Sequence, residues 1–189
     1  DFHIVSLFIS WQKKYGKMLS HWLYMCNETE VALSLATIGH TRKNTTMPVL
    51  LKETLPHIDA AALENILISE NTSVANSADL RPSLNVITGS NMSGKTTWLR
   101  TIAASCILAY AGAPVAATRL CLTPMTILTS IRVSDDLGNG ISTFYAELTR
   151  IKVMIETTET DRPVLAVIDE IFKGTNSADR IICAKTGRS

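Results

Sequence analysis

The sequence predicts an α/β fold in which helices flank a mostly parallel sheet, and three observations support this prediction. A β-prone apolar run from Leu84 to Ile87 leads into a glycine-rich loop and then a helix-like run that reaches Leu108. The segment from Thr143 to Thr158 has the periodicity of an amphipathic helix. It lies between two further apolar runs, and strands that alternate with helices are typical of parallel sheets.

The first elements along the chain are expected to be helices. Up to about Thr41, apolar and aromatic residues recur at spacings of three and four, and we interpret this stripe as packing in a core. A polar loop follows from Arg42 to Pro48, and the mixed stretch from Val49 to Arg81 has only a weak strand signal at Ile66 to Ile68. The stripe consists of Trp11, Tyr15, Met18, Trp22, Met25, Val31, Leu35 and Ile38.

The glycine-rich loop matches a phosphate-binding pattern. It reads G-S-N-M-S-G-K-T, which satisfies G-x-x-x-x-G-K-[ST] in full. Gly89 and Gly94 let the backbone curl so that N–H groups face one anion, and the next helix adds partial positive charge at its N-terminus. Lys95 is expected to reach the outer phosphates and the Thr96 hydroxyl to ligate Mg²⁺. The alternative is a Gly/Ser turn that opens an ordinary helix. The predicted nucleotide-binding residues are Gly89, Ser90, Asn91, Met92, Ser93, Gly94, Lys95, Thr96 and Thr97.

Two carboxylates follow the last apolar run, Pro163 to Ile168. A run without alternation is typical of a strand that is buried on both faces, as in a parallel sheet. At its end, Asp169 is expected to hold Mg²⁺ and Glu170 to polarise the water that attacks the γ-phosphate. The alternative is a strand that simply ends at solvent with two acidic residues.

The connection between the two motifs contains one more strand and one more helix. Pro124 to Val133 is predicted to be a strand, and a turn-rich loop from Asp135 to Gly140 follows it. Ser142 is a good N-cap for the helix from Thr143 to about Thr158. The expected apolar stripe of this helix is Phe144, Leu148, Ile151 and Ile155. A short helix is expected from about Ala178.

Composition excludes several classes of protein. The formal net charge of +1 over 189 residues gives no support for a strong nucleic-acid footprint. The four cysteines are scattered without a C-x-x-C pair, which favours a reducing, cytoplasmic compartment over a disulfide framework or a zinc site. The run between Arg100 and Arg119 carries no charge and approaches the length of a membrane span. Because it contains Gly112 and Pro114 and continues the loop's helix, we predict a buried helix instead.

Four blocks of sequence resemble the ATPase domain of the MutS DNA mismatch-repair family, a group of ABC-type P-loop ATPases. The resemblance extends from about Ser69 to the end of the chain and, more weakly, to Glu30–Ala36, which is similar to the family's returning lever and core helices. It implies a P-loop ATPase domain at 49–189, incomplete at its C-terminus, after a helical core or lever segment at 1–48. The blocks are Ile87–Thr97, Gly112–Ala116, Arg132–Glu147 with its Ser-Thr-Phe, and Ile168–Asp179.

The resemblance implies roles for further residues. Asn91 would sense the γ-phosphate of ATP, and Ser142 looks like the signature serine that reaches the partner's nucleotide in a homodimer. Asp135 and Asp136 match acidic residues before that serine. ATP and Mg²⁺ are the implied ligands, and the family couples the ATP cycle to clamping on DNA, here through regions outside this chain. The implied subunit-interface loop contains Thr175, Asn176, Ser177 and Asp179.

The sequence also departs from the family pattern. All four histidines precede the phosphate loop, so the family's histidine after the last catalytic strand does not occur in this sequence, and we expect a truncated fragment. Asn65-Ile66 stands where the family has a His-Pro pair. These traits look like those of short, divergent MutS-like proteins. Three functions stay open: a mismatch-repair ATPase, a MutS-like ATPase in recombination control or a membrane-associated assembly, and a nucleotide-binding module without turnover.

Overall fold

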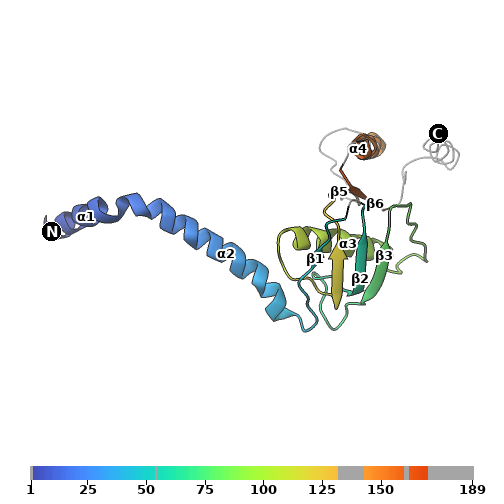
Figure 1. Ribbon diagram of the computed structural model, residues 1–189, viewed down its shortest axis with the longest axis horizontal. Helices are drawn as coiled ribbons and strands as arrows, with labels where there is room; N and C mark the ends of the chain where they lie inside the picture. The colour runs from blue at the N-terminus through green and yellow to red at the C-terminus, as the bar shows by residue number, and fades with distance from the viewer. Residues whose placement is uncertain (1, 54, 132–142, 160–161, 170–189) are drawn as a thin grey trace.

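A helical arm extends from a compact body in the computed structural model (Figure 1). The structure describes residues 2–53, 55–131, 143–159 and 162–169. The arm consists of helix α1 (Phe2–Tyr15), the 3₁₀ turn η1 (Gly16–Met18) and helix α2 (Leu19–Thr41). The helical periodicity of the first 41 residues is therefore confirmed. The 3₁₀ turn begins at Gly16, a residue with low helix propensity.

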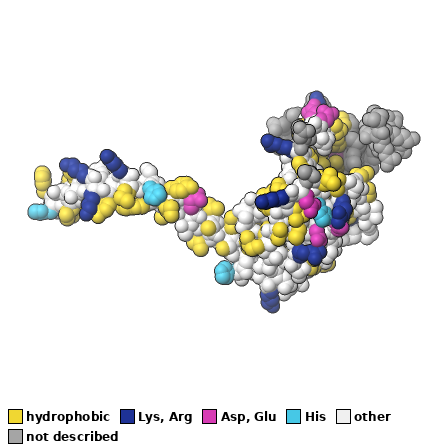
Figure 2. All heavy atoms as spheres, viewed as in Figure 1, with side chains coloured by type: hydrophobic (Ala, Val, Ile, Leu, Met, Phe, Trp, Pro, Cys, Tyr) yellow, Lys and Arg dark blue, Asp and Glu magenta, His cyan; other side chains and the backbone are white. Residues whose placement is uncertain are grey.

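The aromatic stripe of the arm does not lie in a core, which corrects the sequence interpretation. Neither α1 nor α2 contributes a buried residue to the described part of the chain. The rings pack on one another instead, with centroid separations of 6.2 Å for Phe8 and Trp11, 6.3 Å for Trp11 and Tyr15, and 5.9 Å for Tyr15 and Trp22. Figure 2 shows hydrophobic side chains along the arm. The periodicity correctly predicted helices, but it could not show whether another element covers them.

The body contains a four-stranded mixed sheet. Its strands are β1 (Val49–Leu50), β2 (Ile58–Leu63), β3 (Asn76–Leu80) and β4 (Arg119–Leu122), in the order β1-β4-β2-β3. β1 pairs with β4 in parallel, whereas β2 is antiparallel to both of its neighbours. The expectation of a mostly parallel sheet is therefore wrong for this sheet. β2 and β3 were not predicted from the sequence. The weak strand signal at Ile66 to Ile68 falls in the loop between them.

Helix α3 (Lys95–Tyr110) packs against one face of this sheet (Figure 1). Ile102, Cys106 and Ala109 of the helix are buried in one cluster with residues of β2 and β4. The uncharged run after Arg100 is thus a core helix and its continuation, as predicted. None of the helices in the described ranges combines the length and the hydropathy that crossing a bilayer requires. The sheet residues of the cluster are Ile58, Ala60, Leu63, Leu120 and Leu122.

A second, two-stranded sheet confirms the predicted strand–helix–strand unit. β5 (Thr126–Ser130) pairs in parallel with β6 (Val164–Ile168), and helix α4 (Thr143–Thr158) lies between them in sequence and contacts both. The inward face of α4 differs from the expected stripe, because Met154 is buried whereas Leu148 and Ile155 are exposed. A mixed α/β fold is therefore confirmed.

The segment before the glycine-rich loop is not a strand, contrary to expectation. Residues 84–90 form no regular element, and no described strand pairs with them. The side chains of Leu84 and Val86 are 83% and 71% exposed, so the apolar residues there lack a neighbouring surface. A run of apolar residues becomes a strand only when another strand satisfies its backbone groups, and the described residues supply none here.

Candidate functional site

The glycine-rich loop curls through two left-handed residues immediately before α3. Met92 has a φ of 64° and Gly94, the N-cap of α3, has a φ of 87°. The backbone N–H of Ser93 donates to the Ser90 carbonyl at 3.3 Å, which closes the turn. Glycine carries no penalty at positive φ, so Gly94 suits this sharp entry into the helix. Met92 adopts the same region with an exposed side chain.

Gly89 is required by close packing within the loop. A Cβ at this position would lie 2.8 Å from Ser93 Oγ, closer than real Cβ contacts come. It would also lie 3.8 Å from Cδ of Lys95, so the backbone of Gly89 passes directly beside the lysine side chain. The loop is therefore a tight cradle in which the first glycine makes room for Ser93 and Lys95.

The side chain of Lys95 folds back over the loop. Its Nζ donates to the carbonyl oxygens of Gly89 and Ser90 at 2.7 and 2.6 Å. An ammonium group has three donors and no acceptor, so these two bonds leave one donor for another oxygen. The arrangement places a positive charge directly over the loop and beside the first turn of α3, where the helix dipole is also positive.

The two predicted motifs meet through Thr96 and Asp169. The Thr96 hydroxyl donates a hydrogen bond of 2.7 Å to Asp169 Oδ2. Thr96 lies in the first turn of α3, and Asp169 directly follows β6. The Asp169 N–H donates to the Ser130 carbonyl at 3.0 Å and so extends the β5–β6 ladder by one bond. The parallel pairing of β5 and β6 therefore helps to hold the carboxylate in position beside the glycine-rich loop.

The donor chemistry of this pair fits Mg²⁺. A hydroxyl and a carboxylate are hard oxygen donors, and Mg²⁺ is usually held by one or two carboxylates together with substrate phosphates and water. The oxygens of Thr96 and Asp169 are already within hydrogen-bond distance of each other, and both residues are only half buried. No described group of three or more His, Cys, Asp and Glu residues could hold a metal by itself. The pair therefore suits a cation that takes most of its other ligands from a phosphate and water.

The remaining predicted residues divide into two groups. Ser90, Asn91 and Ser93 are exposed at the surface of the loop, and the Thr97 carbonyl accepts a bond of 2.7 Å from Thr101 Oγ1 inside α3. Seven predicted residues lie outside the residues whose side chains the structure describes, together with the acidic pair Asp135 and Asp136. The seven are Glu170, Ser142, Phe144, Thr175, Asn176, Ser177 and Asp179.

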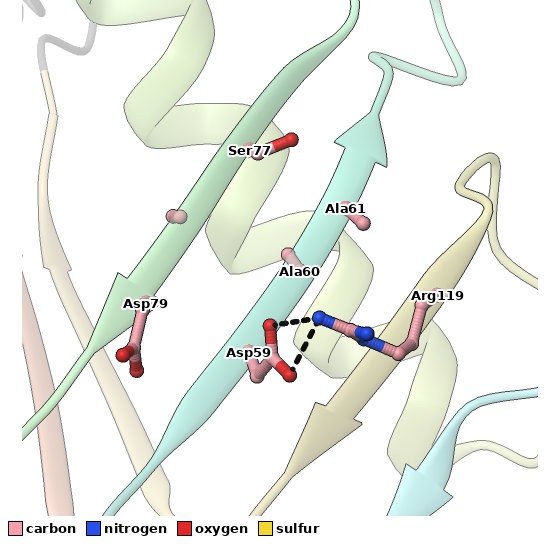
Figure 3. Close-up of a pocket in the computed structure, with 7 residues that line it drawn as sticks. Asp59, Ala60, Ala61, Ser77, Asp79 and Arg119 are labelled. Carbon is pink, nitrogen blue, oxygen red and sulfur yellow. Dashed lines mark hydrogen bonds and ion pairs between the residues drawn. The ribbon is translucent and has the colours of Figure 1, made fainter.

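A polar cluster on the other face of the mixed sheet was not predicted. Alternation along β2 directs Ile58 and Ala60 toward α3 and Asp59 to the opposite face. Figure 3 shows Asp59 and Arg119 side by side across β2 and β4, and Arg119 Nη2 lies 2.9 Å from both carboxylate oxygens. This interaction with Asp59 raises the pKa of Arg119. The cluster lies on a solvated face of the sheet, on the side opposite the core that packs under α3.

Two further polar residues connect the arm to α3, the helix after the glycine-rich loop. Arg42, at the end of α2, is largely buried and donates to backbone carbonyls of the loop after β2. Asn65 in that loop donates to Thr101 of α3 at 3.0 Å. The sequence pattern indicated only that Arg42 begins a polar loop and that Asn65 departs from a family motif. No local pattern marks such contacts, because the partners are distant in sequence.

The fold and the loop together define a class: mixed α/β proteins that carry a glycine-rich loop at the start of a helix. The family profile of MutS domain V matches residues 85–187, more than half of the chain. The chain therefore belongs to the MutS family.

Named relatives agree with this assignment. The chain is 34% identical over 162 residues to the DNA mismatch repair protein MutS of Clostridioides difficile. This match covers 82% of this chain and 17% of that protein. It is 37% identical over 108 residues to DNA mismatch repair protein MutS 2 of Haloarcula marismortui, and this match covers 57% of this chain and 11% of the relative. It is 36% identical over 114 residues to the DNA mismatch repair protein MutS of Natronomonas pharaonis, and this match covers 59% of this chain and 13% of the relative. The chain thus spans less than a fifth of the length of these relatives.

Proposed function

We propose that this chain is the nucleotide-binding part of a MutS-type ATPase that binds and hydrolyses Mg²⁺-ATP. The observation that supports this proposal best is the contact between Thr96 and Asp169 beside Lys95. It unites a hydroxyl, a carboxylate and an ammonium group at the N-terminus of one helix, and these are the groups that phosphoryl-transfer proteins use. Division into a helical segment at 1–48 and an ATPase domain at 49–189 is part of the proposal.

The loop would bind the triphosphate through charge and backbone donors. Lys95 would exchange the carbonyls of Gly89 and Ser90 for oxygens of the outer phosphates, because a charge-assisted bond to an anion is stronger than one to a neutral carbonyl. The free N–H groups at the start of α3 add to the attraction. Asn91, exposed on the loop, would contact the γ-phosphate.

Thr96 and Asp169 would hold Mg²⁺, which supplies charge neutralisation at the β- and γ-phosphate oxygens. The Thr96 hydroxyl would then exchange its bond to Asp169 for the cation. Glu170, next to Asp169 in sequence, would accept a proton from the attacking water.

Hydrolysis is proposed to require two copies of the ATPase domain. Ser142 would approach the nucleotide of the partner subunit, and the loop with Thr175, Asn176, Ser177 and Asp179 would contact that subunit. Closure of the homodimer would then change the conformation of regions outside this chain that bind mismatched or otherwise structured DNA. The relatives' names, which refer to DNA mismatch repair, support this role over recombination control or a membrane-associated assembly.

The test is nucleotide binding and phosphate release by this chain with Mg²⁺, measured for the parent and for Lys95→Ala. Lys52→Ala is the matched control, because it also removes one lysine charge but lies at an exposed position after β1. We expect Lys95→Ala to abolish binding and Lys52→Ala to leave it unchanged. Equal affinities of all three proteins, with circular dichroism showing intact folds, would refute the assignment of the loop.

The DNA role needs a separate measurement on the full-length protein that contains this chain. We expect mismatched duplex DNA to change its rate of ATP hydrolysis relative to fully paired DNA of the same length. A rate that no DNA alters, in a protein that hydrolyses ATP, would instead favour the second role, a MutS-like ATPase that serves another assembly. Binding of ATP without any hydrolysis would favour a nucleotide-binding module.

A further inference from the structure

The hydroxyl group of Tyr110 bridges two backbone groups in the connection between the two sheets. Tyr110 is the last residue of α3, and its hydroxyl donates to the Thr123 carbonyl at 3.0 Å and accepts from the Met125 N–H at 3.0 Å. The segment from Thr123 to Met125 joins β4 of the four-stranded sheet to β5 of the two-stranded sheet. A tyrosine hydroxyl both donates and accepts, and both capacities are used here.

The surroundings of this bridge are well defined. Thr123 is buried, and its N–H and Oγ1 donate to the carbonyl oxygens of His57 and Leu55 at 2.9 and 3.1 Å. Burial raises the pKa of Tyr110 above its ordinary value of 10.0, so the hydroxyl keeps the proton that it donates at neutral pH. Loss of the hydroxyl would remove a partner from two backbone groups at once, which is costly where water cannot replace it.

Helix α3 is attached to the β5–β6 pair near both of its ends. At its C-terminal end, Tyr110 bonds to Met125, which directly precedes β5. In its first turn, Thr96 bonds to Asp169, which directly follows β6. Because β5 and β6 are parallel, α3 runs antiparallel to both, and it contacts both strands between the two attachments.

The lengths of the helix and the strands match between these attachments. At about 1.5 Å per residue, α3 rises about 21 Å from Thr96 to Tyr110. The strand register places Asp169 just beyond the last pair of the ladder. At about 3.3 Å per residue, the strand distance from Met125 to the level of Asp169 is about 20 Å. Both attachments therefore form together, and a helix displaced along the strands by one residue, about 1.5 Å, would break one of them.

We propose that Tyr110 is a positioning residue whose hydroxyl fixes α3 along β5 and β6 and so sets the distance between Thr96 and Asp169. Its importance for Mg²⁺ rests on the proposed function of that pair. The apolar contacts under α3 are not directional and tolerate a small displacement along the strands, whereas hydrogen bonds have narrow limits of distance and angle. Tyr110 lies about 21 Å from Thr96 along the helix, so it acts through the backbone and touches neither nucleotide nor cation.

The first experiment measures the distance between two spin labels in the nucleotide-free chain. One label is on Ile107→Cys of α3 and the other on Lys152→Cys of α4, which packs on β5 and β6. Both positions are exposed. Cys106 can stay, because burial raises the pKa of its thiol to about 12 and leaves it unreactive. The other cysteines are replaced by Ser: Cys26, Cys121 and Cys183.

Tyr110→Phe is the main variant, because it removes the hydroxyl and keeps the ring. Tyr24→Phe removes the same atom from an exposed residue of α2 and is the matched control. We expect a broader distance distribution for Tyr110→Phe and the parental width for Tyr24→Phe. Equal widths in all three proteins overturn the proposal. Amide exchange in the parent is a test that needs no variant: the Met125 N–H should be protected, and exchange at the rate of an unfolded chain overturns the proposal.

The second experiment titrates ATP with Mg²⁺ and with chelator, and it separates positioning from general stability. We expect Tyr110→Phe to bind ATP like the parent in chelator and to lose roughly threefold of the affinity that Mg²⁺ adds, since the two ligands are misplaced and not deleted. An equal loss in both conditions, or no loss in either, overturns the positioning role.

The two experiments also separate this inference from the proposed function. A parent that binds no ATP refutes the proposed function of the loop. The nucleotide-free distributions of the same proteins still decide the geometric role of Tyr110, because they need no ligand. A broader distribution for Tyr110→Phe then supports the fixing of α3 along the strands, and an unchanged one overturns it.

Discussion

The hydroxyl of Thr96 lies 2.7 Å from Asp169 Oδ2, although 73 residues separate the two in sequence. Thr96 lies in the first turn of the helix after the glycine-rich loop, and Asp169 directly follows the last described strand. The contact depends on three elements at once: the helix N-terminus, the β5–β6 pairing and the packing of α3 beside both strands. It brings together the two motifs that the sequence predicted separately.

Loss of either member of this pair should remove the Mg²⁺ dependence of ATP binding. Thr96→Ala deletes a hydroxyl ligand, and Asp169→Asn deletes a charge, so we expect ATP affinity in the presence of Mg²⁺ to fall by roughly tenfold for each, which corresponds to about 1.4 kcal/mol. Titrations with and without chelator measure this effect. Thr96→Ser is the control and should retain the dependence. Variants whose affinity still responds fully to Mg²⁺ would exclude the pair as the cation site.

Substitution of Gly89 tests the close packing of the loop. The new Cβ of Gly89→Ala meets Ser93 Oγ at 2.8 Å, so Ser93 must move and the loop loses its cradle. We expect weaker ATP binding. Addition of Ser93→Ala should restore part of the affinity, because the nearest remaining atom is then Ser93 Cβ at 3.6 Å, an ordinary contact. If the double variant binds no better than Gly89→Ala alone, the clash is not the cause.

Glu170→Gln should separate binding from hydrolysis. The amide has nearly the shape of the carboxylate but cannot take a proton from water, so ATP binds while turnover falls by about a hundredfold or more. The closed dimer should then accumulate in any version of the protein that turns over ATP. Phosphate release measures the rate, and sedimentation in the presence of ATP detects the dimer. A variant that hydrolyses ATP at the parental rate would remove Glu170 from the proposed mechanism.

The sheet face opposite α3 offers a test by pH titration. His57 Nε2 lies 2.8 Å from Asp79 Oδ1, and this hydrogen bond, with Arg81 nearby, holds the pKa of Asp79 below its ordinary value of 3.8. His57→Ala should therefore raise the pKa of Asp79 toward 3.8, as carbon NMR of the carboxyl group would detect.

The sign of the pH effect follows from the direction of that shift. A lowered pKa in the folded state means that the interaction stabilises the protein above the unfolded pKa of about 3.8 and is lost as the pH falls below it. Stability near neutral pH should not depend on the protonation of Asp79. A pKa of Asp79 that is the same in the parent and in His57→Ala would show that the hydrogen bond does not persist in solution.

Local patterns predicted the loop, the helix after it and the second sheet, but wrongly predicted a strand at Leu84 to Ile87. The loop from Gly89 to Thr96, the helix after it and the β5–α4–β6 unit follow from residue spacing alone, because turn chemistry and periodicity act over a few residues. The same reasoning failed for β2 and β3. These strands contain alanines and polar residues, and they form because each finds a partner strand, which a local pattern does not encode.

The sequence by itself therefore predicted the chemistry of the candidate site: a glycine-rich loop with a lysine and a threonine, of the kind that binds phosphate, and an aspartate directly after an apolar strand. Only the tertiary structure decided that Thr96 meets Asp169, that the larger sheet is mixed, and that Arg42 and Asn65 connect the arm to α3. The physical reason is the range of the interactions. Backbone propensity and side-chain periodicity are properties of neighbouring residues, whereas strand pairing and buried polar contacts depend on how distant segments pack.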